Sequence, residues 1–258
     1  MDKFIETEKI REIVESTYDL VKDDKEGANA DYIPYLANVP SSLFGIAVCL
    51  PSGEIIEKGD TGYVFGIESI SKVPTAILAM QQHGAEEILH KIGSDATGLP
   101  FNSIMAILLE SDHPSTPLVN SGAISACSMI KPQGDAKAKW DEIMSFIQKL
   151  CATKLDVIEE LYKSESDTNF NNKAIAWLLK NYDRIYDNPD MALDIYTRQC
   201  SIGVTARALA IMAATIANKG LNPLSNEQVF DSEIAPKITS MISTVGFYEH
   251  TGLAYKVK

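Results

Sequence analysis

Cysteine and histidine are scarce in this chain of 258 residues, which contains four of each. Cys49, Cys127, Cys151 and Cys200 lie far apart and form no Cys-x-x-Cys pair, so the sequence indicates neither a zinc knuckle nor a disulfide framework. No histidine stands in a His-x-x-x-His or His-Glu-x-x-His arrangement. We therefore expect no metal site and no metal cofactor.

Positive charge is also in short supply, because 23 Lys and Arg face 35 Asp and Glu. The resulting net charge of -12 repels polyanions, so we expect neither a nucleic-acid partner nor an anionic membrane surface. The longest basic segment, Lys131 to Lys139, is diluted by Pro132, Gly134 and Asp135 and is expected to be the solvated start of a helix. No apolar run reaches the length of a membrane span, and Met1 to Glu6 lacks a secretory signal, which predicts a cytoplasmic protein.

Hydrophobic residues make up 45% of the chain, enough to bury a substantial core. Apolar spacing predicts an amphipathic helix over residues 8–21. Residues 43–50 and 54–60 flank Pro51-Ser52-Gly53 in the pattern of an antiparallel hairpin, which argues against a doubly wound sheet. Further short strands are predicted over 63–67 and 253–257.

Most of the remaining sequence has helical periodicity. A helix is predicted from Ser71, with Pro74 in its first turn and Gly84 as its stop. Other helices are predicted over 102–109, 122–130, 140–151, 172–179, 204–218 and 234–243. The fold class is therefore α+β. We expect one domain over 1–258, with a sheet-containing part of about 1–75 and 230–258 and a helical part of about 76–229.

The spacing Ser-x-x-Lys occurs twice, at Ser69 to Lys72 and at Ser128 to Lys131. Two common residue types at a fixed offset arise by chance about once in a chain of this length, so the spacing alone is weak evidence. The second copy ends an apolar helical run just before Pro132, where nothing favours a site.

The first copy lies at a predicted strand-to-helix junction. Free backbone N–H groups and the positive end of the helix dipole favour the negative charge of an oxyanion there. Residues three apart share a helical face, so the Lys72 amine can reach the Ser69 hydroxyl. Partial burial would lower the lysine pKa and let the neutral amine accept the hydroxyl proton. The context predicts Ser69 as nucleophile and Lys72 as base; the alternative is an N-cap serine and a solvent-facing lysine.

The surrounding sequence resembles the glutaminase family in order and spacing over essentially the whole chain. Ser-Asp-Asn and Lys-Thr-Gly elements, expected of relatives that act on β-lactams or peptidoglycan, are absent from the sequence. The resemblance implies a serine β-lactamase/DD-peptidase-like fold, with an antiparallel sheet flanked by helices and a helical subdomain. The matching stretches are Asp31–Pro34, Gly45–Cys49, Ser69–Lys72, Pro100–Ser103, Pro117–Ile124, Cys200–Thr205 and Gly246–Tyr248.

Catalytic roles follow from the same resemblance. It implies that Ser69 attacks the side-chain amide carbon of L-glutamine, with Lys72 as base, and that water hydrolyses the resulting glutamyl-enzyme. Tyr248 matches the tyrosine that passes a proton to the leaving ammonia, and Tyr32 matches one that lines the pocket near the nucleophile. Without the resemblance, Tyr248 would be an aromatic residue at a helix end and Tyr32 a packing residue.

Substrate binding needs partners for both charges of a free amino acid, because neither can stay unpaired in a buried pocket. Glu165 and Asn172 match family substrate-binding positions, and their separation of seven residues predicts that they share one face of a single helix. Asn120 and Tyr196 match the remaining positions. Together with Ser69 and Tyr248, these four are the predicted substrate-binding residues; each would otherwise be interpreted as a surface or capping residue.

The sequence departs from the family in three places. Glu68 stands before the nucleophile where the family often has Gln, and Ser115-Thr116 occupy positions where a basic and an amide residue are common. Family members also continue beyond the predicted strand near Tyr255 with a glycine-rich element that would supply a central strand and one oxyanion donor. Loss of one such donor lowers the rate by about 10²–10³-fold.

The leading hypothesis is a glutaminase without metal or organic cofactor, with L-glutamine as its small-molecule partner. The family resemblance also favours a homodimer or homotetramer. Two alternatives stay open at this point. One is another Ser-x-x-Lys acyl-transferase or amidase on the same fold, and the other is a catalytically impaired, truncated homologue that binds an amino acid or a partner subunit.

Overall fold

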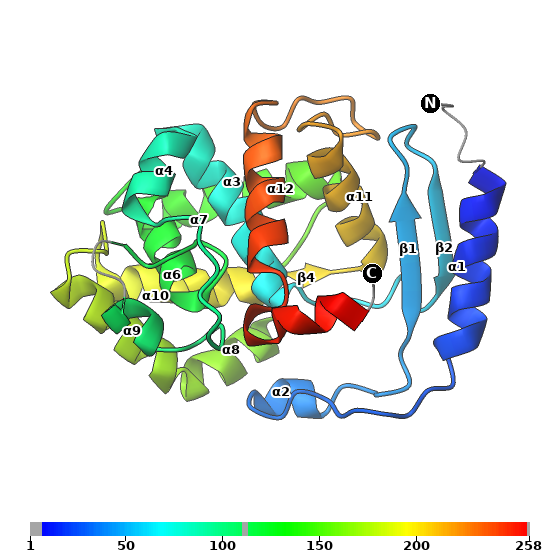
Figure 1. The fold of residues 1–258 in the computed structure, drawn as a ribbon, viewed down its shortest axis with the longest axis horizontal. Coiled ribbons are helices and arrows are strands. Elements are labelled where there is room, and N and C mark those ends of the chain that lie inside the picture. Colours follow the sequence, from blue (N-terminus) through cyan, green and yellow to red (C-terminus); the bar gives the residue numbers. More distant parts are fainter. Residues whose placement is uncertain (1–6, 110–112, 257–258) are drawn as a thin grey trace.

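The N-terminal part combines one helix with a β-hairpin (Figure 1). The computed structural model describes residues 7–109 and 113–256. Helix α1 (Thr7–Val21) packs beside strands β1 (Gly45–Cys49) and β2 (Ile55–Gly59), which pair antiparallel. The stacked rings of Tyr18 and Phe44, 5.4 Å apart, join the helix to the hairpin. The predicted helix and hairpin are both confirmed.

A second, smaller pair of strands joins distant parts of the chain. Strand β3 (Phe65–Gly66) pairs antiparallel with β4 (Gly203–Val204). The helix predicted from residue 204 therefore begins later, as α11 (Ala206–Ala217), because Thr205 caps it and accepts a hydrogen bond from the Ala208 N–H. The pairing brings the chain that precedes Ser69 against the end of the helix before β4.

Ser69 lies where β3 turns into the central helix of the molecule. A 3₁₀ turn, η1 (Glu68–Ser71), runs directly into α3 (Lys72–His83), which ends at Gly84 with φ 88°. The predicted start and stop of this helix are confirmed. Gly84 ends the helix because glycine adopts such a φ without strain. Helix α3 is buried along most of its length, with Ile77 and Ala79 fully covered.

Helices build the rest of the molecule around two apolar clusters. The elements not yet named are α2 (Pro34–Ala37), α4 (Ala85–Lys91), α5 (Met105–Leu109), α6 (Asn120–Met129), α7 (Ala136–Cys151), α8 (Glu159–Thr168), α9 (Phe170–Asn181), α10 (Pro189–Cys200), α12 (Ile234–Val245) and the 3₁₀ segment η2 (Tyr248–Lys256). The larger cluster surrounds α3 and includes α11, and the smaller one lies between α5, α6, α9 and α10. Sequence periodicity missed α2, α4, α8 and α10.

The strand predicted over 253–257 is wrong for its described residues, which belong to η2. Gly246 and Tyr248 have φ values of 55° and 54°, so the chain turns back after α12. The Thr251 hydroxyl holds this turn, because its single hydrogen is shared between the carbonyls of Tyr248 at 2.8 Å and Val245 at 3.1 Å. Residue 257 lies outside the described part of the chain.

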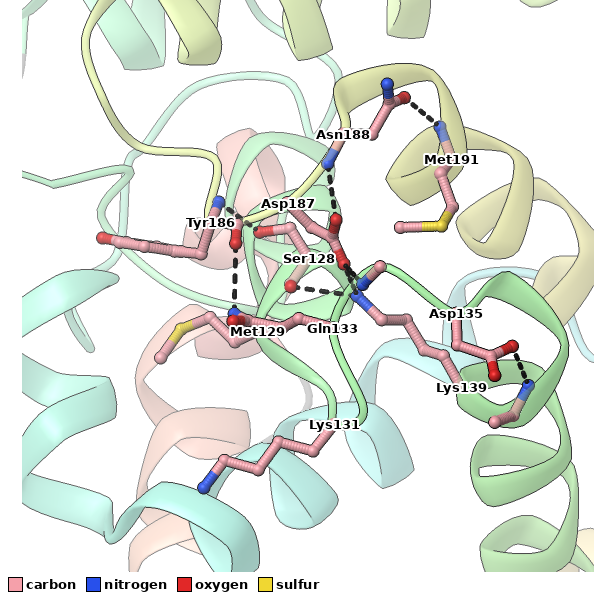
Figure 2. Close-up of polar contacts among 12 residues, drawn as sticks. Ser128, Met129, Lys131, Gln133, Asp135, Lys139, Tyr186, Asp187, Asn188 and Met191 are labelled. Atoms are coloured by element: carbon pink, nitrogen blue, oxygen red, sulfur yellow. Dashed lines mark hydrogen bonds and ion pairs between the residues drawn. The ribbon is translucent and has the colours of Figure 1, made fainter.

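Residues 131–137 are exposed and lead into α7, so the solvated helix start predicted for Lys131 to Lys139 is confirmed for them and wrong for Lys139. Figure 2 shows the Lys139 amine directed at Asp187, and its Nζ lies 2.7 Å from Asp187 Oδ2 and 3.1 Å from the Ser128 carbonyl. Its side chain is fully buried. Lys139 therefore anchors α7 to the rest of the helical body.

The architecture is α+β, helix-rich with small antiparallel sheets, as predicted. The division of one domain into a sheet-containing and a helical part stays a prediction. Within the described residues, every helix is too short or too polar to cross a membrane.

Candidate active site

Ser69 and Lys72 contact each other directly. Lys72 Nζ donates a hydrogen bond of 2.6 Å to Ser69 Oγ, the contact expected of residues three apart in a helical segment. Ser69 is exposed, whereas Lys72 is only 1% exposed. The hydroxyl is therefore accessible to a ligand while the amine behind it is shielded from water.

The surroundings of Lys72 favour its neutral form. Its Nζ lies 5.7 Å from the Phe101 ring centre and 6.0 Å from that of Tyr196, and no salt bridge to it occurs among the described residues. Burial lowers the pKa of the Lys72 amine to about 8. The negative groups nearby oppose this shift without cancelling it. A neutral amine bonded to a hydroxyl can act as its base.

A pocket of about 370 Å³ opens in front of Ser69. It collects side chains from η1, α6, α8, α9 and α10 and from the loops before α2 and α5, so segments far apart in the sequence form one cavity. Its lining consists of Tyr32, Ile33, Glu68, Ser69, Phe101, Asn102, Asn120, Glu165, Thr168, Asn169, Asn171, Asn172, Tyr196 and Cys200.

One wall of the pocket is a chain of neutral polar groups. The Tyr196 hydroxyl donates to Asn120 Oδ1 at 3.1 Å, and Asn120 Nδ2 donates to Asn172 Oδ1 at 2.8 Å. Asn120 and Tyr196 are 4% and 2% exposed, so these bonds fix the orientation of both amides. The side-chain N–H₂ group of Asn172 belongs to the same wall and is a neutral donor.

Glu165 and Asn172 do not share a helix, contrary to the expectation from their spacing. Helix α8 ends at Thr168 and α9 begins at Phe170, and Asn169 between them leaves helical geometry at φ −80°, ψ 38°. The Asn169 side chain donates to Thr197 Oγ1 at 2.7 Å, which fastens this break between the two helices to α10. Both residues nevertheless line the pocket.

Two carboxyl groups lie in the pocket lining, on Glu68 and Glu165. Glu68 has a φ of 50°, an uncommon value for a residue with a side chain. Burial raises the pKa of Glu68 to about 7, against the charge of Lys72. Burial, and after it the charge of Glu68, raise the pKa of Glu165 to about 8.

The two predicted tyrosines occupy different positions. Tyr32 is 63% exposed and lines the pocket, and burial of its hydroxyl raises its pKa. Tyr248 is half-buried beside Phe101, with ring centres 5.8 Å apart, and its hydroxyl donates to the Leu118 carbonyl at 3.1 Å. Tyr248 is not among the residues that line the pocket. Its reach to a leaving group stays a prediction.

Several pocket residues were not identified from the sequence as site residues. Phe101, Asn102 and Cys200 stand inside stretches that carry the family resemblance, so that signal was available. Asn171, which lines the pocket and donates to the Asn102 carbonyl at 2.8 Å, carried no such signal. Among the described residues, no group of three or more His, Cys, Asp and Glu side chains could hold a metal ion.

A helix-rich body with small antiparallel sheets, and a serine bonded to a buried lysine at the start of its central helix, define a hydrolase of the β-lactamase-like fold. The family model described as Glutaminase matches residues 27–258. The chain therefore belongs to the glutaminase family, whose members are amidohydrolases.

Individual relatives agree with this assignment. Glutaminases of Parabacteroides distasonis and Bacteroides thetaiotaomicron are each 66% identical to the chain over 252 residues, covering 98% of it and 78% of the relative. A solved structure of a probable glutaminase, YbaS, has a TM-score of 0.94 and 39% identity, over 98% of this chain and 82% of that one. A probable glutaminase from Bacillus subtilis, complexed with 6-diazo-5-oxo-L-norleucine, has a TM-score of 0.80 and 26% identity, over 99% and 78% of the two chains.

Proposed function

We propose that this chain hydrolyses the side-chain amide of L-glutamine to L-glutamate and ammonia, and that Ser69 carries the glutamyl group between the two halves of the reaction. The observation that carries the assignment of Ser69 is the 2.6 Å hydrogen bond from a lysine that is 1% exposed. A lysine in water is charged and cannot accept a proton, whereas this one has a pKa lowered to about 8 by burial.

In the first half-reaction, Ser69 Oγ bonds to the amide carbon while neutral Lys72 takes the hydroxyl proton. The negative charge moves to the amide oxygen, beside the N-terminal turn of η1 and α3, whose dipole favours it. The carbon–nitrogen bond then breaks, and the nitrogen leaves as ammonia after receiving the proton that Lys72 took from Ser69. Tyr248 is the proposed carrier of this proton, and Lys72 is neutral again. In the second half-reaction, water attacks the ester carbon and gives one proton to Lys72, which passes it to Ser69 Oγ as the ester bond breaks.

Recognition of the amino-acid end divides between charged and neutral groups. Glu165 is 8% exposed and is the proposed partner of the substrate ammonium. Asn120, Asn172 and Tyr196 form the hydrogen-bonded wall and are the proposed partners of the substrate carboxylate. Tyr32 would cover the ligand from the solvent side.

Incubation of the purified chain with L-glutamine, followed by measurement of glutamate and ammonia, tests the function. Activity that vanishes in Ser69→Ala and Lys72→Ala but survives in Ser128→Ala would support the assignment. A folded chain without glutaminase activity that is acylated by a β-lactam or an ester would support a different Ser-x-x-Lys enzyme instead.

Covalent labelling gives a second, independent test. The Bacillus subtilis relative is complexed with 6-diazo-5-oxo-L-norleucine, a glutamine analogue. We expect this reagent to add to Ser69, as seen by peptide mass spectrometry, and to leave Ser128 unmodified. Modification elsewhere, with Ser69 intact, would contradict the assignment of the nucleophile.

The oligomeric state and the cellular location of the chain are also part of the proposal. The resemblance to glutaminases supports a homodimer or homotetramer, and the sequence supports a cytoplasmic location. Sedimentation of the purified chain and fractionation of the cells that make it would check these two points.

A further inference from the structure

The carboxyl groups of Glu68 and Glu165 belong to one pocket. Both residues line it, and the charge of Glu68 adds to the burial that raises the pKa of Glu165. Glu68 Oε1 and Glu165 Oε2 are both buried, and neither has a hydrogen-bond partner among the described residues. A buried ionised oxygen without a partner is costly, so two such oxygens in one pocket would destabilise the fully ionised state.

The local structure holds Glu68 in this position. Its carbonyl accepts a 2.6 Å hydrogen bond from the Ser71 hydroxyl, which fixes the turn at φ 50°. A Cβ atom on Gly66 would lie 3.1 Å from Glu68 Oε1 and 2.3 Å from Leu161 Cδ2. Glycine at position 66 therefore leaves room for Leu161 and for the carboxyl oxygen beside it.

The other titratable groups around the two carboxyls form no ion pair with them among the described residues. Lys72 on α3 lowers the pKa of both carboxyls, but its amine bonds to Ser69 and burial lowers its own pKa to about 8. Burial raises the pKa of Cys200 and Tyr196 on α10 well above their ordinary values, and it also raises the pKa of Tyr32. These three groups are neutral near pH 7. The described residues that line the pocket include no lysine, arginine or histidine, so the ammonium of a ligand can supply positive charge there.

We propose that Glu68 and Glu165 together carry one proton before substrate binds, and that the substrate ammonium displaces this proton into solvent. Glu68 is then a second partner of the ammonium beside Glu165, and binding of the amino acid is coupled to proton release. The balance is simple: a half-protonated carboxyl pair and an ammonium become two carboxylates, the bound ammonium and one free proton. This inference rests on the proposed function, because it names how the same pocket takes its substrate.

Isothermal titration of the Ser69→Ala chain with L-glutamine at pH 7, in phosphate and in Tris, measures the coupling. The two buffers differ in ionisation enthalpy, so the difference in observed heat counts the protons released. We expect about 0.5–1 proton per glutamine in Ser69→Ala. We expect at most about half as many in Ser69→Ala/Glu68→Gln, because the glutamine side chain has the shape of glutamate but cannot ionise, and only burial then raises the pKa of Glu165. Glu159→Gln, which replaces an exposed carboxyl on the same helix as Glu165, is the matched control and should release as many protons as its parent.

Kinetics of the active chain provide a second measurement that does not need the Ser69→Ala background. As the pH falls from 7 to 5.5, KM should rise at least about threefold in the parent, because a protonated pair binds an ammonium poorly. The rise in Glu68→Gln should be at most about half as large, because Glu165 is then protonated at a lower pH than beside the charge of Glu68. Equal proton release, or equal KM profiles, with and without Glu68 would overturn the proposal while glutamine turnover by the parent left the function standing. A parent chain that neither binds nor hydrolyses glutamine would overturn both.

Discussion

Ser69 and Lys72 lie where a helix begins, whereas Ser128 and Lys131 lie where a helix ends. At the first pair the lysine amine turns inward and bonds to the serine. At the second, Ser128 is buried and accepts from the Tyr186 N–H at 2.9 Å, while Lys131 is exposed and donates to the Gln82 carbonyl at 3.3 Å. A Ser-x-x-Lys spacing thus becomes a candidate site only where helical geometry continues through the lysine.

A buried lysine lies close to each serine, and the partners of the two lysines differ. Lys139 has a carboxylate, Asp187, at 2.7 Å beside the Ser128 carbonyl (Figure 2). Burial by itself would raise the pKa of Asp187, but hydrogen bonds from Lys139 and two backbone N–H groups hold it below its ordinary value. Lys72 lies over aromatic rings and bonds to a hydroxyl. Lys139, which has a carboxylate partner, stabilises the fold. Lys72, which has only the Ser69 hydroxyl as a hydrogen-bond partner, is available for chemistry.

The largest expected effect is on catalysis. Ser69→Ala and Lys72→Ala should each lower kcat for glutamine by about 10³-fold or more, since nucleophile and base act as a unit. Ser128→Ala should change kcat less than about twofold when compared at equal folded concentration. A large loss in Ser128→Ala, measured by ammonia release, would break the distinction between the two pairs.

The free energy of unfolding should depend more on Lys139, near the second pair, than on Lys72 of the first pair. Lys139→Met should lower the free energy of unfolding by about 2–3 kcal/mol, because the partly buried Asp187 loses its cation and keeps only the N–H donors of Gly134 and Asn188. Lys72→Met should lower it by less than about 1 kcal/mol or raise it, since it replaces a buried amine that has no carboxylate partner among the described residues. Urea denaturation followed by circular dichroism measures both.

A double variant sharpens this second prediction. Lys139→Met/Asp187→Leu removes both charges and should recover most of the loss seen in Lys139→Met alone. If the double variant is as unstable as the single one, the damage comes from packing and the ion pair is not its cause.

The next effect concerns pH. Lys72 acts as a base only when neutral, and its pKa of about 8 means that this form grows as the pH rises. At saturating glutamine, kcat should therefore increase about tenfold per pH unit below 8 and level off above it. At saturating glutamine the rate does not depend on substrate affinity, so the proposed release of a proton on binding does not affect kcat. A rate that is flat from pH 6 to 9 would contradict a lysine base.

The smallest effect is expected at the exposed lysine of the second pair. Lys131→Ala removes one solvent-facing hydrogen bond, so the free energy of unfolding should change by less than about 0.5 kcal/mol and activity should be unaffected. The same urea and ammonia measurements apply. A loss of several kcal/mol would show that Lys131 belongs to the Lys139 ion pair more closely than its geometry indicates.

Elements with strong local signals were predictable. The hairpin has alternating residues around a turn, and α3 has Pro74 early and Gly84 at its end. Helix α10 was missed although a start signal exists in Asn188 and Pro189, where the asparagine side chain accepts the Met191 N–H. Helix α8 has only Leu161 and Glu165 buried, so its apolar periodicity is too weak to detect.

The candidate site was predictable mainly through family resemblance. Tyr32, Ser69, Asn120, Glu165, Asn172 and Tyr196 all line the pocket, although the single helix expected for Glu165 and Asn172 does not exist. Spacing assumed a continuous helix, whereas the chain leaves helical geometry at Asn169, whose side chain bonds to Thr197. The partner of Asn169 lies on another helix, and the periodicity of the sequence carries no information about contacts between helices.

By itself, the sequence determined many short-range features of this protein: most of the long helical segments, where the hairpin turns, and that Lys72 lies one turn from Ser69. Those features depend on neighbours within a few residues, so local propensity and periodicity suffice. The tertiary structure decided which lysine has a carboxylate partner. Asp187 reaches Lys139 across 48 residues, and Glu165 reaches the pocket of Ser69 from a separate helix. Burial and charge at a site depend on segments that meet only when the chain folds.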